Sequence, residues 1–477
     1  MTFDSKQLLR IYFGYDSFRY SQAAIIDHVL SGAHAMVVMP TGMGKSLCYQ
    51  IPALTIDEES RDLVLVLSPL IALMHDQVDS LVRRGIDAAF INSSLDRETR
   101  LQRYREVGEG RYRLLYVTPE RFRKAEFLDV IADRKIKLLA VDEAHCVSQW
   151  GHDFRPDYTR LGDIRASLGN PTTIALTATA TEECRSDIYQ QLGIDPADIR
   201  LFHEGIDRPN LHLEVEPVID DDMKVAAIKH AIAHPEYSGG SVIVYFSLIK
   251  TLQRFSDRLL ADRIDHVCYH GDLQRNGRRR VQDDFMNGDA DLVLATPAFG
   301  MGVDKEDIRV VVHAETPGSI ESYYQEIGRA GRDDNPSLCL WLYDQADLMT
   351  QMQFIEWSNP DADFYTRVYE TIREHHDQCE AFGLDWLNGR LQKRSKHDHR
   401  LATAIAMLDR YGVVAGPRPN ECFEILTALP SYFLDSDALA EKKRRDQQRL
   451  YAMVQLAAET GDRKAFLYHY FLGGEER

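Results

Sequence analysis

Short, nearly continuous apolar runs recur along the first 345 residues, and polar or glycine-rich residues follow each one. Runs with the length of a strand lie at 35–39, 62–67, 113–117, 137–141, 172–176, 241–246, 266–269, 291–295, 309–313 and 337–341. Such runs, alternating with helical periodicity, predict parallel strands that are buried on both faces. The pattern therefore predicts an α/β fold with two tandem parallel-sheet lobes and a boundary near 201–210.

From about residue 345 the periodicity becomes mainly helical. Residues 398–414 have amphipathic helical spacing and residues 422–429 have the pattern of a strand, which together suit a small winged-helix insert. One last helix is expected over 438–470. The expected domains are thus residues 1–205, 206–345 and a helical accessory region, 346–477.

The first apolar run leads into a glycine-containing turn at 40–44, and Lys45 and Ser46 then begin a helix. Glycines let backbone N–H groups approach an anion closely, and a helix N-terminus adds partial positive charge. Lys45 can reach phosphate oxygens, and the Ser46 hydroxyl can ligate Mg²⁺. Met39 stands where the general phosphate loop has glycine, so the fit is to the shorter TGxGKS form. An ordinary glycine-rich turn is the alternative.

Asp142 and Glu143 close another apolar run. Two adjacent carboxylates can divide the work of metal-assisted hydrolysis, with Asp142 holding Mg²⁺ through water and Glu143 polarising the attacking water. A solvated strand end is the alternative interpretation. The phosphate loop about a hundred residues upstream favours the catalytic one.

Composition narrows the class of protein. Hydrophobic residues make up 44% and charged residues 27%, which is typical of a globular protein, and no apolar run approaches the length of a membrane span. Seven scattered cysteines without a CxxC pair favour a reducing cytoplasm and argue against a zinc ribbon. The net charge of −18 is unfavourable for nucleic-acid binding, although a local basic channel can coexist with an acidic exterior.

Nine segments, in chain order, resemble the motifs of the RecQ DNA helicases of superfamily two. They are FGYDSFRYSQ, MPTGMGKSLCYQIPAL, LSPLIALMHDQVDSL, YVTPERF, VDEAHCVSQWGHDFRPDY, ALTATAT, YHGDL, ATPAFGMGVDKEDIRVVVH and SIESYYQEIGRAGRD. The fifth segment is the most specific of them. The resemblance covers residues 9–343 and implies a motor of two RecA-like lobes that uses ATP to unwind DNA in the 3′-to-5′ direction.

The resemblance also implies roles for individual residues. Catalytic roles fall on Lys45, Glu143, Arg329 and Arg332, and Arg332 is the candidate arginine finger. Nucleotide contacts fall on Tyr15, Arg19, Gln22, Thr41, Gly42, Gly44, Lys45, Ser46, Asp142, Asp304 and Gln325, of which Tyr15, Arg19 and Gln22 would read adenine and Ser46 and Asp142 would hold Mg²⁺. DNA binding or coupling falls on His145, Gln149, Trp150, His152, Phe154, Arg155, Thr177, Thr179 and His270.

Three of these assignments have structural alternatives. The segment 13–22, which contains Tyr15, Arg19 and Gln22, could be the start of a surface helix. The aromatic residues Trp150 and Phe154 suit base stacking, but they could instead plug the edge of the core. Arg329 and Arg332 could lie on a solvated helix face.

The sequence departs from the family near its end. Asp462 stands where the RecQ zinc module usually has its first cysteine, so ATP and Mg²⁺ but no structural zinc are expected. The histidines at 375–376 and 397–399 and the basic runs 278–280 and 442–445 are expected to be mostly solvated.

The functional hypothesis is an ATP-dependent 3′-to-5′ helicase that acts on single-stranded and forked DNA in recombination or repair. A monomer in the cytoplasm, associated with the nucleoid in a bacterium and with no membrane attachment, is expected. Two alternatives stay open. One is an RNA helicase, and the other is a DNA-stimulated ATPase that serves as a remodelling or recruitment switch without processive unwinding.

Overall fold

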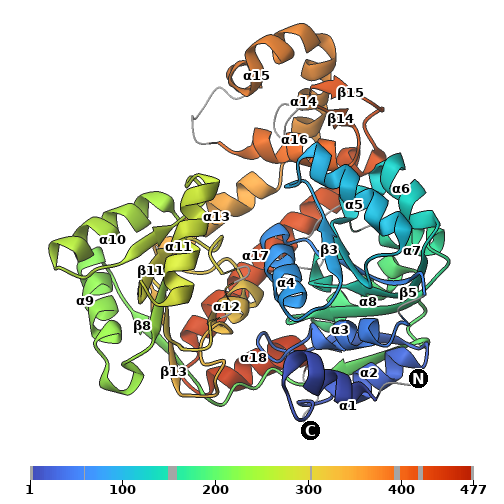
Figure 1. Ribbon diagram of the computed structural model, residues 1–477. Helices are drawn as coiled ribbons and strands as arrows, with labels where there is room; N and C mark the ends of the chain where they lie inside the picture. Colours follow the sequence, from blue (N-terminus) through green and yellow to red (C-terminus); the bar gives the residue numbers. More distant parts are fainter. Residues whose placement is uncertain are drawn as a thin grey trace. The chain divides into compact units, whose positions relative to one another are not determined.

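A computed structural model describes residues 4–57, 60–148, 158, 160–300, 303, 305–391, 398–416 and 423–473 (Figure 1). The chain forms two compact units. The first comprises Met1–Glu315, Glu321–Leu342 and Glu459–Arg477, and the second comprises Thr316–Ile320 and Tyr343–Ala458. Both predicted sheets lie in the first unit.

The first sheet has seven strands in the order β3-β4-β2-β5-β6-β1-β7, and every neighbouring pair is parallel. Its strands are β1 (His34–Val38), β2 (Asp62–Leu67), β3 (Ala88–Ile91), β4 (Leu114–Val117), β5 (Lys135–Val141), β6 (Thr172–Thr177) and β7 (Ile199–His203). Met36 and Val38 belong to one core, whereas Ala35 and Val37 belong to the core on the opposite face. The near-continuous apolar strands are therefore buried on both sides, as predicted.

Helices cover both faces of this sheet and connect its strands. They are α1 (Ser5–Leu8), η1 (Leu9–Phe13), α2 (Gln22–Leu30), α3 (Leu47–Leu54), α4 (Ile71–Arg83), α5 (Arg97–Glu109), η2 (Pro119–Arg123), α6 (Ala125–Ala132), η3 (Ala144–Val147), α7 (Leu161–Ser167) and α8 (Glu182–Leu192). Residues of α2, α3 and α4 pack in one core, and residues of α5 to α8 pack in the other.

The second sheet has six strands in the order β10-β11-β9-β12-β13-β8, and the first five of these pair in parallel. Its strands are β8 (Leu211–Pro217), β9 (Ser241–Tyr245), β10 (Val267–Tyr269), β11 (Leu292–Ala295), β12 (Ile308–His313) and β13 (Ser337–Tyr343). Its helices are α9 (Asp221–Ile232), η5 (Pro235–Tyr237), α10 (Ile249–Ala261), α11 (Arg275–Asn287) and α12 (Ile320–Ile327). The predicted α/β architecture of two parallel-sheet lobes is confirmed.

The second unit is mainly helical, as expected. It contains α13 (Asp347–Ser358), α14 (Ala362–Glu374), α15 (His376–Leu391), α16 (Arg400–Arg410), η6 (Ser431–Leu434) and α17 (Ser436–Ala458), with an antiparallel pair of short strands, β14 (Val414–Ala415) and β15 (Glu424–Ile425). Ordered strand structure in the predicted run 422–429 is thus confined to two residues of its described part. The winged-helix assignment stays a prediction.

The expectation of one last helix over 438–470 was wrong. Two helices occupy this region, α17 and α18 (Arg463–Leu472), and α18 belongs to the first unit. Asp462 has an extended backbone and caps α18, since its carboxylate accepts a hydrogen bond from the Lys464 N–H at 2.8 Å. An aspartate at this position is a favourable N-cap, so a new helix begins after Asp462, four residues beyond the end of α17 at Ala458. Among the described residues, no helix is both long and apolar enough to span a bilayer.

Candidate active site

The order of the first sheet brings the phosphate loop and the acidic pair to the same edge. β1 lies beside β6, and β6 lies beside β5, so the residues that follow these strands emerge next to one another. Val38 pairs with Thr177, and the Met39 N–H donates to the Thr177 carbonyl at 3.0 Å. This is the carboxyl edge of a parallel sheet, where open α/β folds bind ligands.

The phosphate loop has the left-handed backbone that its glycines allow. Gly42 has φ +86° and Gly44 has φ +75°. The Gln22 side chain, which is 2% exposed, donates from Nε2 to the carbonyls of Met43 at 2.9 Å and Gly44 at 3.2 Å. Its Oε1 accepts from the Arg19 N–H at 2.9 Å. The structure therefore places the Gln22 amide against the loop backbone, which it holds in shape.

Lys45 and the acidic pair, Asp142 and Glu143, are ionisable residues next to the phosphate loop. Lys45 Nζ donates to the Met39 carbonyl at 2.9 Å. Burial lowers the pKa of Lys45, and the nearby charges of Glu143 and Asp142 oppose that shift. Asp142 is 7% exposed, and burial, reinforced by the charge of Glu143 and opposed by Lys45, raises its pKa to about 7. Without a bound cation, this carboxyl group thus titrates near neutral pH.

Glu143 has φ +48° and ψ +49°, a left-handed backbone that a non-glycine residue rarely adopts. Its buried Oε2 has no hydrogen-bond partner among the described residues and lies 3.4 Å from His145 Nδ1. Strained backbone and an unsatisfied carboxylate oxygen are both costly, and both are typical of functional sites. These two features make Glu143 a candidate functional residue of the site.

His145 joins this carboxylate to the end of β6. Its Nδ1 lies 3.0 Å from Thr177 Oγ1, and the Thr177 hydroxyl donates to the Thr179 carbonyl at 3.1 Å. Thr177 Oγ1 also accepts from the Thr179 N–H at 3.2 Å. A proton on His145 Nδ1 would point toward Thr177, whose own hydroxyl proton bonds the Thr179 carbonyl. The hydrogen bonds thus run from His145 to Thr179, and Glu143 lies beside them at an ion-pair distance from His145.

The second lobe contributes arginines to the same site. Arg332 packs on the phosphate loop, because a Cβ added at Gly42 would lie 3.2 Å from Arg332 Cγ. Arg329 is buried and donates from Nη1 to the Gly300 carbonyl. These positions exclude the solvated-face alternative for both arginines.

A cavity of about 1100 Å³ joins these groups. The predicted residues that line it are Tyr15, Arg19, Thr41, Gly42, Gly44, Lys45, Ser46, Asp142, Glu143, His145, Gln325, Arg329 and Arg332. Both lobes contribute to the lining, and glycine N–H groups, a lysine, two arginines and two carboxylates fit a nucleoside triphosphate with its cation.

Several predicted residues lie elsewhere. Gln22 and Thr177 do not line the cavity but bond the lining residues Gly44 and His145, and Thr179 bonds Thr177. His270 does not line the cavity, and its buried Nδ1 has no hydrogen-bond partner among the described residues. Asp304, Gln149, Trp150, His152, Phe154 and Arg155 lie outside the described residues.

The sequence did not indicate the outer part of the lining. Helix α4 supplies polar residues that include Asp76 and Gln77, and α11 supplies Arg279, Gln282 and Asp283. Asp76 and Gln77 lie in the family-like segment 67–81 and Arg279 in the basic run 278–280, but nothing in these patterns assigned them to the cleft. The predicted solvated state of the basic run on α11 is seen in Arg279 and Arg280, which are exposed and pair with Asp283 and Asp284.

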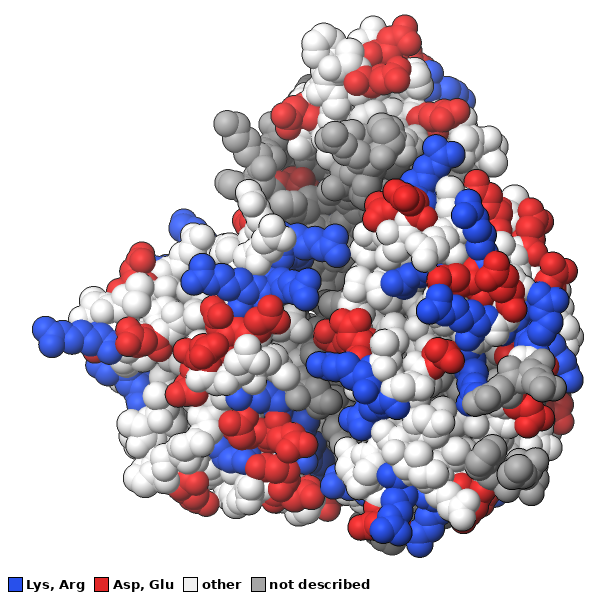
Figure 2. Space-filling model, in the orientation of Figure 1, with Lys and Arg blue, Asp and Glu red and all other residues white. Residues whose placement is uncertain are grey.

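Acidic and basic side chains are interspersed over the face shown in Figure 2. At physiological salt, interactions between exposed charges are largely screened beyond about 8 Å. The net charge of −18 therefore does not appear on this face as one continuous acidic field.

The two parallel-sheet lobes that share this cleft correspond to two helicase family domains. Residues 19–186 match the DEAD/DEAH box helicase family, and residues 223–334 match the helicase conserved C-terminal domain. A solved structure of the helicase MrfA bound to DNA and AMPPNP has a TM-score of 0.61 and 20% identity, covering 73% of this chain and 52% of that one. That likeness shows the fold.

The sequence relatives are more specific. The chain is 42% identical over 340 residues to the ATP-dependent DNA helicase RecQ of Haemophilus influenzae, covering 71% of this chain and 53% of that protein. It is 38% identical over 377 residues to the "Probable ATP-dependent DNA helicase RecS" of Bacillus subtilis, covering 79% and 74%. The chain belongs to the RecQ family of superfamily two helicases. It spans about half the length of the Haemophilus RecQ protein that it matches.

Proposed function

We propose that this protein hydrolyses ATP to move 3′-to-5′ along single-stranded DNA and to unwind duplex or forked DNA. The observation that carries the proposal is the position of Arg332 of one lobe on Gly42 in the phosphate loop of the other. A site built across two lobes makes hydrolysis depend on their approach, which is what a motor needs. The relatives named as DNA helicases support DNA as the track.

Each lining residue has a role in this proposal. The glycine N–H groups and Lys45 bind the phosphates, while Ser46 and Asp142 hold Mg²⁺. Glu143 orients the attacking water and accepts its proton. Arg332, assisted by Arg329, stabilises the charge that develops on the transferring phosphoryl group. Mg²⁺, when bound, supplies charge neutralisation at the phosphate oxygens.

The adenine end of the site would involve Tyr15 and Arg19. Both line the cavity, and Tyr15 is half-exposed, so its ring is available for stacking. Gln22 acts from behind them through the loop that it holds. Asp304 and Gln325 are proposed to complete the nucleotide contacts from the second lobe.

DNA is proposed to reach the catalytic centre through the residues that follow Glu143. The segment with Gln149, Trp150, His152, Phe154 and Arg155 would stack and grip bases. His145, Thr177 and Thr179 would pass the DNA-bound state to Glu143, and they are already joined by hydrogen bonds. His270 would contact DNA from the second lobe.

We further propose residues 1–205 and 206–345 as the two motor lobes and residues 346–477 as an accessory region. The protein would act as a monomer without structural zinc, in recombination or repair, in the cytoplasm and at the nucleoid of a bacterium. Figure 2 shows no extended basic face in that view. The switch without processive unwinding therefore stays the second candidate.

The test compares ATP hydrolysis with no nucleic acid, single-stranded DNA and RNA, and then unwinding of duplexes with 3′ or 5′ tails. The proposal expects strong stimulation by DNA, weak stimulation by RNA, unwinding of the 3′-tailed duplex and loss of all activity in Lys45→Ala. Hydrolysis that ignores DNA would refute the motor. Stimulation without strand separation would favour the switch, and opening of the 5′-tailed duplex alone would reverse the polarity.

A further inference from the structure

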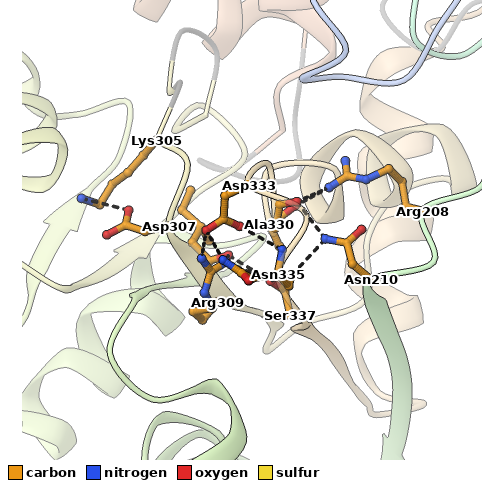
Figure 3. A network of polar contacts seen from close by, with 11 residues as sticks. Arg208, Asn210, Lys305, Asp307, Arg309, Ala330, Asp333, Asn335 and Ser337 are labelled. Carbon is orange, nitrogen blue, oxygen red and sulfur yellow. Dashed lines mark hydrogen bonds and ion pairs between the residues drawn. The ribbon is translucent and has the colours of Figure 1, made fainter. Parts of the chain in front are cut away.

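The linker between the two sheets, residues 204–210, runs from the end of β7 to the start of β8. Two of its side chains, Arg208 and Asn210, form hydrogen bonds to one turn of the second lobe (Figure 3). Arg208 Nη2 donates to the carbonyls of Ala330 and Gly331, both at 2.8 Å. Asn210 Nδ2 donates to the same Gly331 carbonyl at 2.8 Å. Arg208 is 8% exposed, so these bonds are shielded from water. A charged donor in a buried site makes a strong hydrogen bond to a carbonyl.

The turn that accepts these hydrogen bonds lies between Arg329 and Arg332, the two arginines of the cleft. Ala330 and Gly331 are the only residues between Arg329 and Arg332 in the sequence. The direction in which the Arg332 side chain leaves the backbone therefore depends on this turn. The aliphatic part of the Arg332 side chain must stay against Gly42 for the Arg332 guanidinium to remain in the site.

Gly331 has little freedom to move. Its φ is +58°, and its N–H donates to the Ile308 carbonyl of β12 at 2.9 Å. A Cβ added there would lie 2.3 Å from Asn210 Nδ2. Both polar groups of Gly331 are thus bonded, and Asn210 occupies the space that a side chain would need.

Asn210 also forms a second set of hydrogen bonds. Its Nδ2 also donates to the Asn335 carbonyl at 3.0 Å, and its own carbonyl accepts from the Ser337 N–H at 2.9 Å. Arg309 pairs with Asp333 and donates to Ser337 Oγ at 3.3 Å. Figure 3 shows this network continuing from the linker to the start of β13. The hydrogen bonds from Arg208 and Asn210 to the turn are therefore part of a larger polar network.

Residues outside the linker also form hydrogen bonds to its backbone. Lys464 of α18 donates from Nζ to the carbonyls of Arg208 at 3.1 Å and Pro209 at 3.0 Å. The Tyr324 hydroxyl of α12 donates to the Ile206 carbonyl at 2.8 Å. The segment that connects the two lobes is thus bonded to α12 and α18 as well as to the arginine turn of the second lobe.

We propose that Arg208 and Asn210 are positioning residues for the arginine finger, Arg332. They connect the strand of chain that joins the lobes to the backbone that aims Arg332 into the cleft. The inference rests on the proposed ATP hydrolysis. It adds that the interlobe linker, which neither contacts the phosphate loop nor lines the cavity, controls the rate of the chemical step.

The test uses conservative changes in the full chain. Arg208→Lys keeps the charge but loses the planar fork, and Asn210→Asp keeps the shape but replaces a donor with an acceptor. DNA-stimulated hydrolysis should fall about 10–100-fold in kcat, the scale of a slightly misplaced catalytic group. KM and the binding of fluorescent ADP should change by less than about twofold, because ground-state contacts remain. Arg254→Lys, at an exposed pair with Asp221, is the matched control.

A double-mutant cycle separates positioning from general loss of structure. In an Arg332→Ala background, Asn210→Asp should alter the residual kcat, followed with radiolabelled ATP, by less than about twofold. Equal losses in both backgrounds, or unchanged kcat in the single variants, would overturn the inference. If Arg208→Lys fails to fold, Asn210→Asp and Asn210→Ser carry the test. A wild-type protein without DNA-stimulated hydrolysis would instead defeat the proposed function.

Discussion

The side chain of Arg332 lies on the backbone of Gly42, so that the second lobe touches the phosphate loop at the residue that follows Thr41. Arg332→Ala should leave ADP binding nearly intact and lower kcat about 10³–10⁵-fold, the usual loss for an arginine finger. DNA-stimulated phosphate release measures the effect. Arg254→Ala, at an exposed arginine of the same lobe, should change kcat little. A similar loss in both variants would contradict the assignment.

Gly42→Ala tests the same contact from the other side. The new methyl group would lie 3.2 Å from Arg332 Cγ, in a backbone with φ +86°. Gly85→Ala is a matched control, because Gly85 has φ +77° with no described atom within 4 Å of the added Cβ. Both changes should cost about 1 kcal/mol through backbone strain. Only Gly42→Ala should lower kcat, by at least about tenfold, because it displaces a catalytic group.

The strands with continuous apolar runs could be predicted closely, because burial on both faces leaves a direct trace in the sequence. In the two parallel sheets, the strands that escaped prediction are β3, β7 and β8, and each lies at an edge of its sheet. In β8 exposed and half-buried residues follow Leu211, so the apolar run that indicates an interior strand is missing. The edge position alone does not explain the misses, since all four residues of β3 are buried and the edge strand β10 was predicted.

The candidate site likewise contains residues that could be predicted from the local sequence and residues that could not. Lys45, Asp142 and Arg332 could be named from local motifs, since their neighbours in sequence define their chemistry. Arg208 and Asn210 indicated only a domain boundary, because their bonds to Ala330 and Gly331 span more than a hundred residues. Nothing in a local pattern reports a contact of that separation.

Thr177→Val tests the chain of hydrogen bonds behind Glu143. Valine has nearly the shape of threonine but can neither accept from His145 nor donate to the Thr179 carbonyl. Hydrolysis without DNA should stay within about twofold, while the stimulation by DNA should fall about tenfold or more, since a lost buried hydrogen bond costs roughly 1–3 kcal/mol. The measurement is the ratio of ATPase rates with and without single-stranded DNA. Thr366→Val, whose hydroxyl bonds its own helix at the Ala362 carbonyl, should keep that ratio; a drop in both variants would rule out a specific link.

Arg134 stabilises the first sheet without a carboxylate partner at its guanidinium among the described hydrogen bonds. It is 5% exposed and donates to the carbonyls of Arg61, Asp62, Val107 and Tyr112 at 2.5–3.2 Å. Arg134→Met should leave these carbonyls unsatisfied and cost about 3 kcal/mol or more. Differential scanning calorimetry should show a Tm of the first unit lower by about 3–5 °C. Arg254→Met should shift Tm little, and an unchanged Tm in Arg134→Met would refute the structural role.

The titration of Asp142 should affect both cation binding and stability. Burial raises its pKa from 3.8 to about 7 in the protein without a cation. A carboxyl group whose pKa is raised by folding contributes stability that is fully present below the unfolded value and is lost as the pH rises toward 7. Mg²⁺ has the opposite requirement, because it binds the charged carboxylate and competes with the proton.

The two effects can be measured on one pair of proteins. Below pH 7, the apparent Mg²⁺ affinity, followed by titration of fluorescent-ADP binding, should fall about tenfold per pH unit in the wild type. Asp142→Asn should bind Mg²⁺ weakly at every pH and lose that slope. Without cation, raising the pH from 5 to 8 should lower Tm more in the wild type than in Asp142→Asn, since only the wild type must ionise a buried carboxyl group. A wild-type Mg²⁺ affinity that is independent of pH between 5 and 8 would show that Asp142 is already charged throughout, and would remove it as the group that limits cation binding.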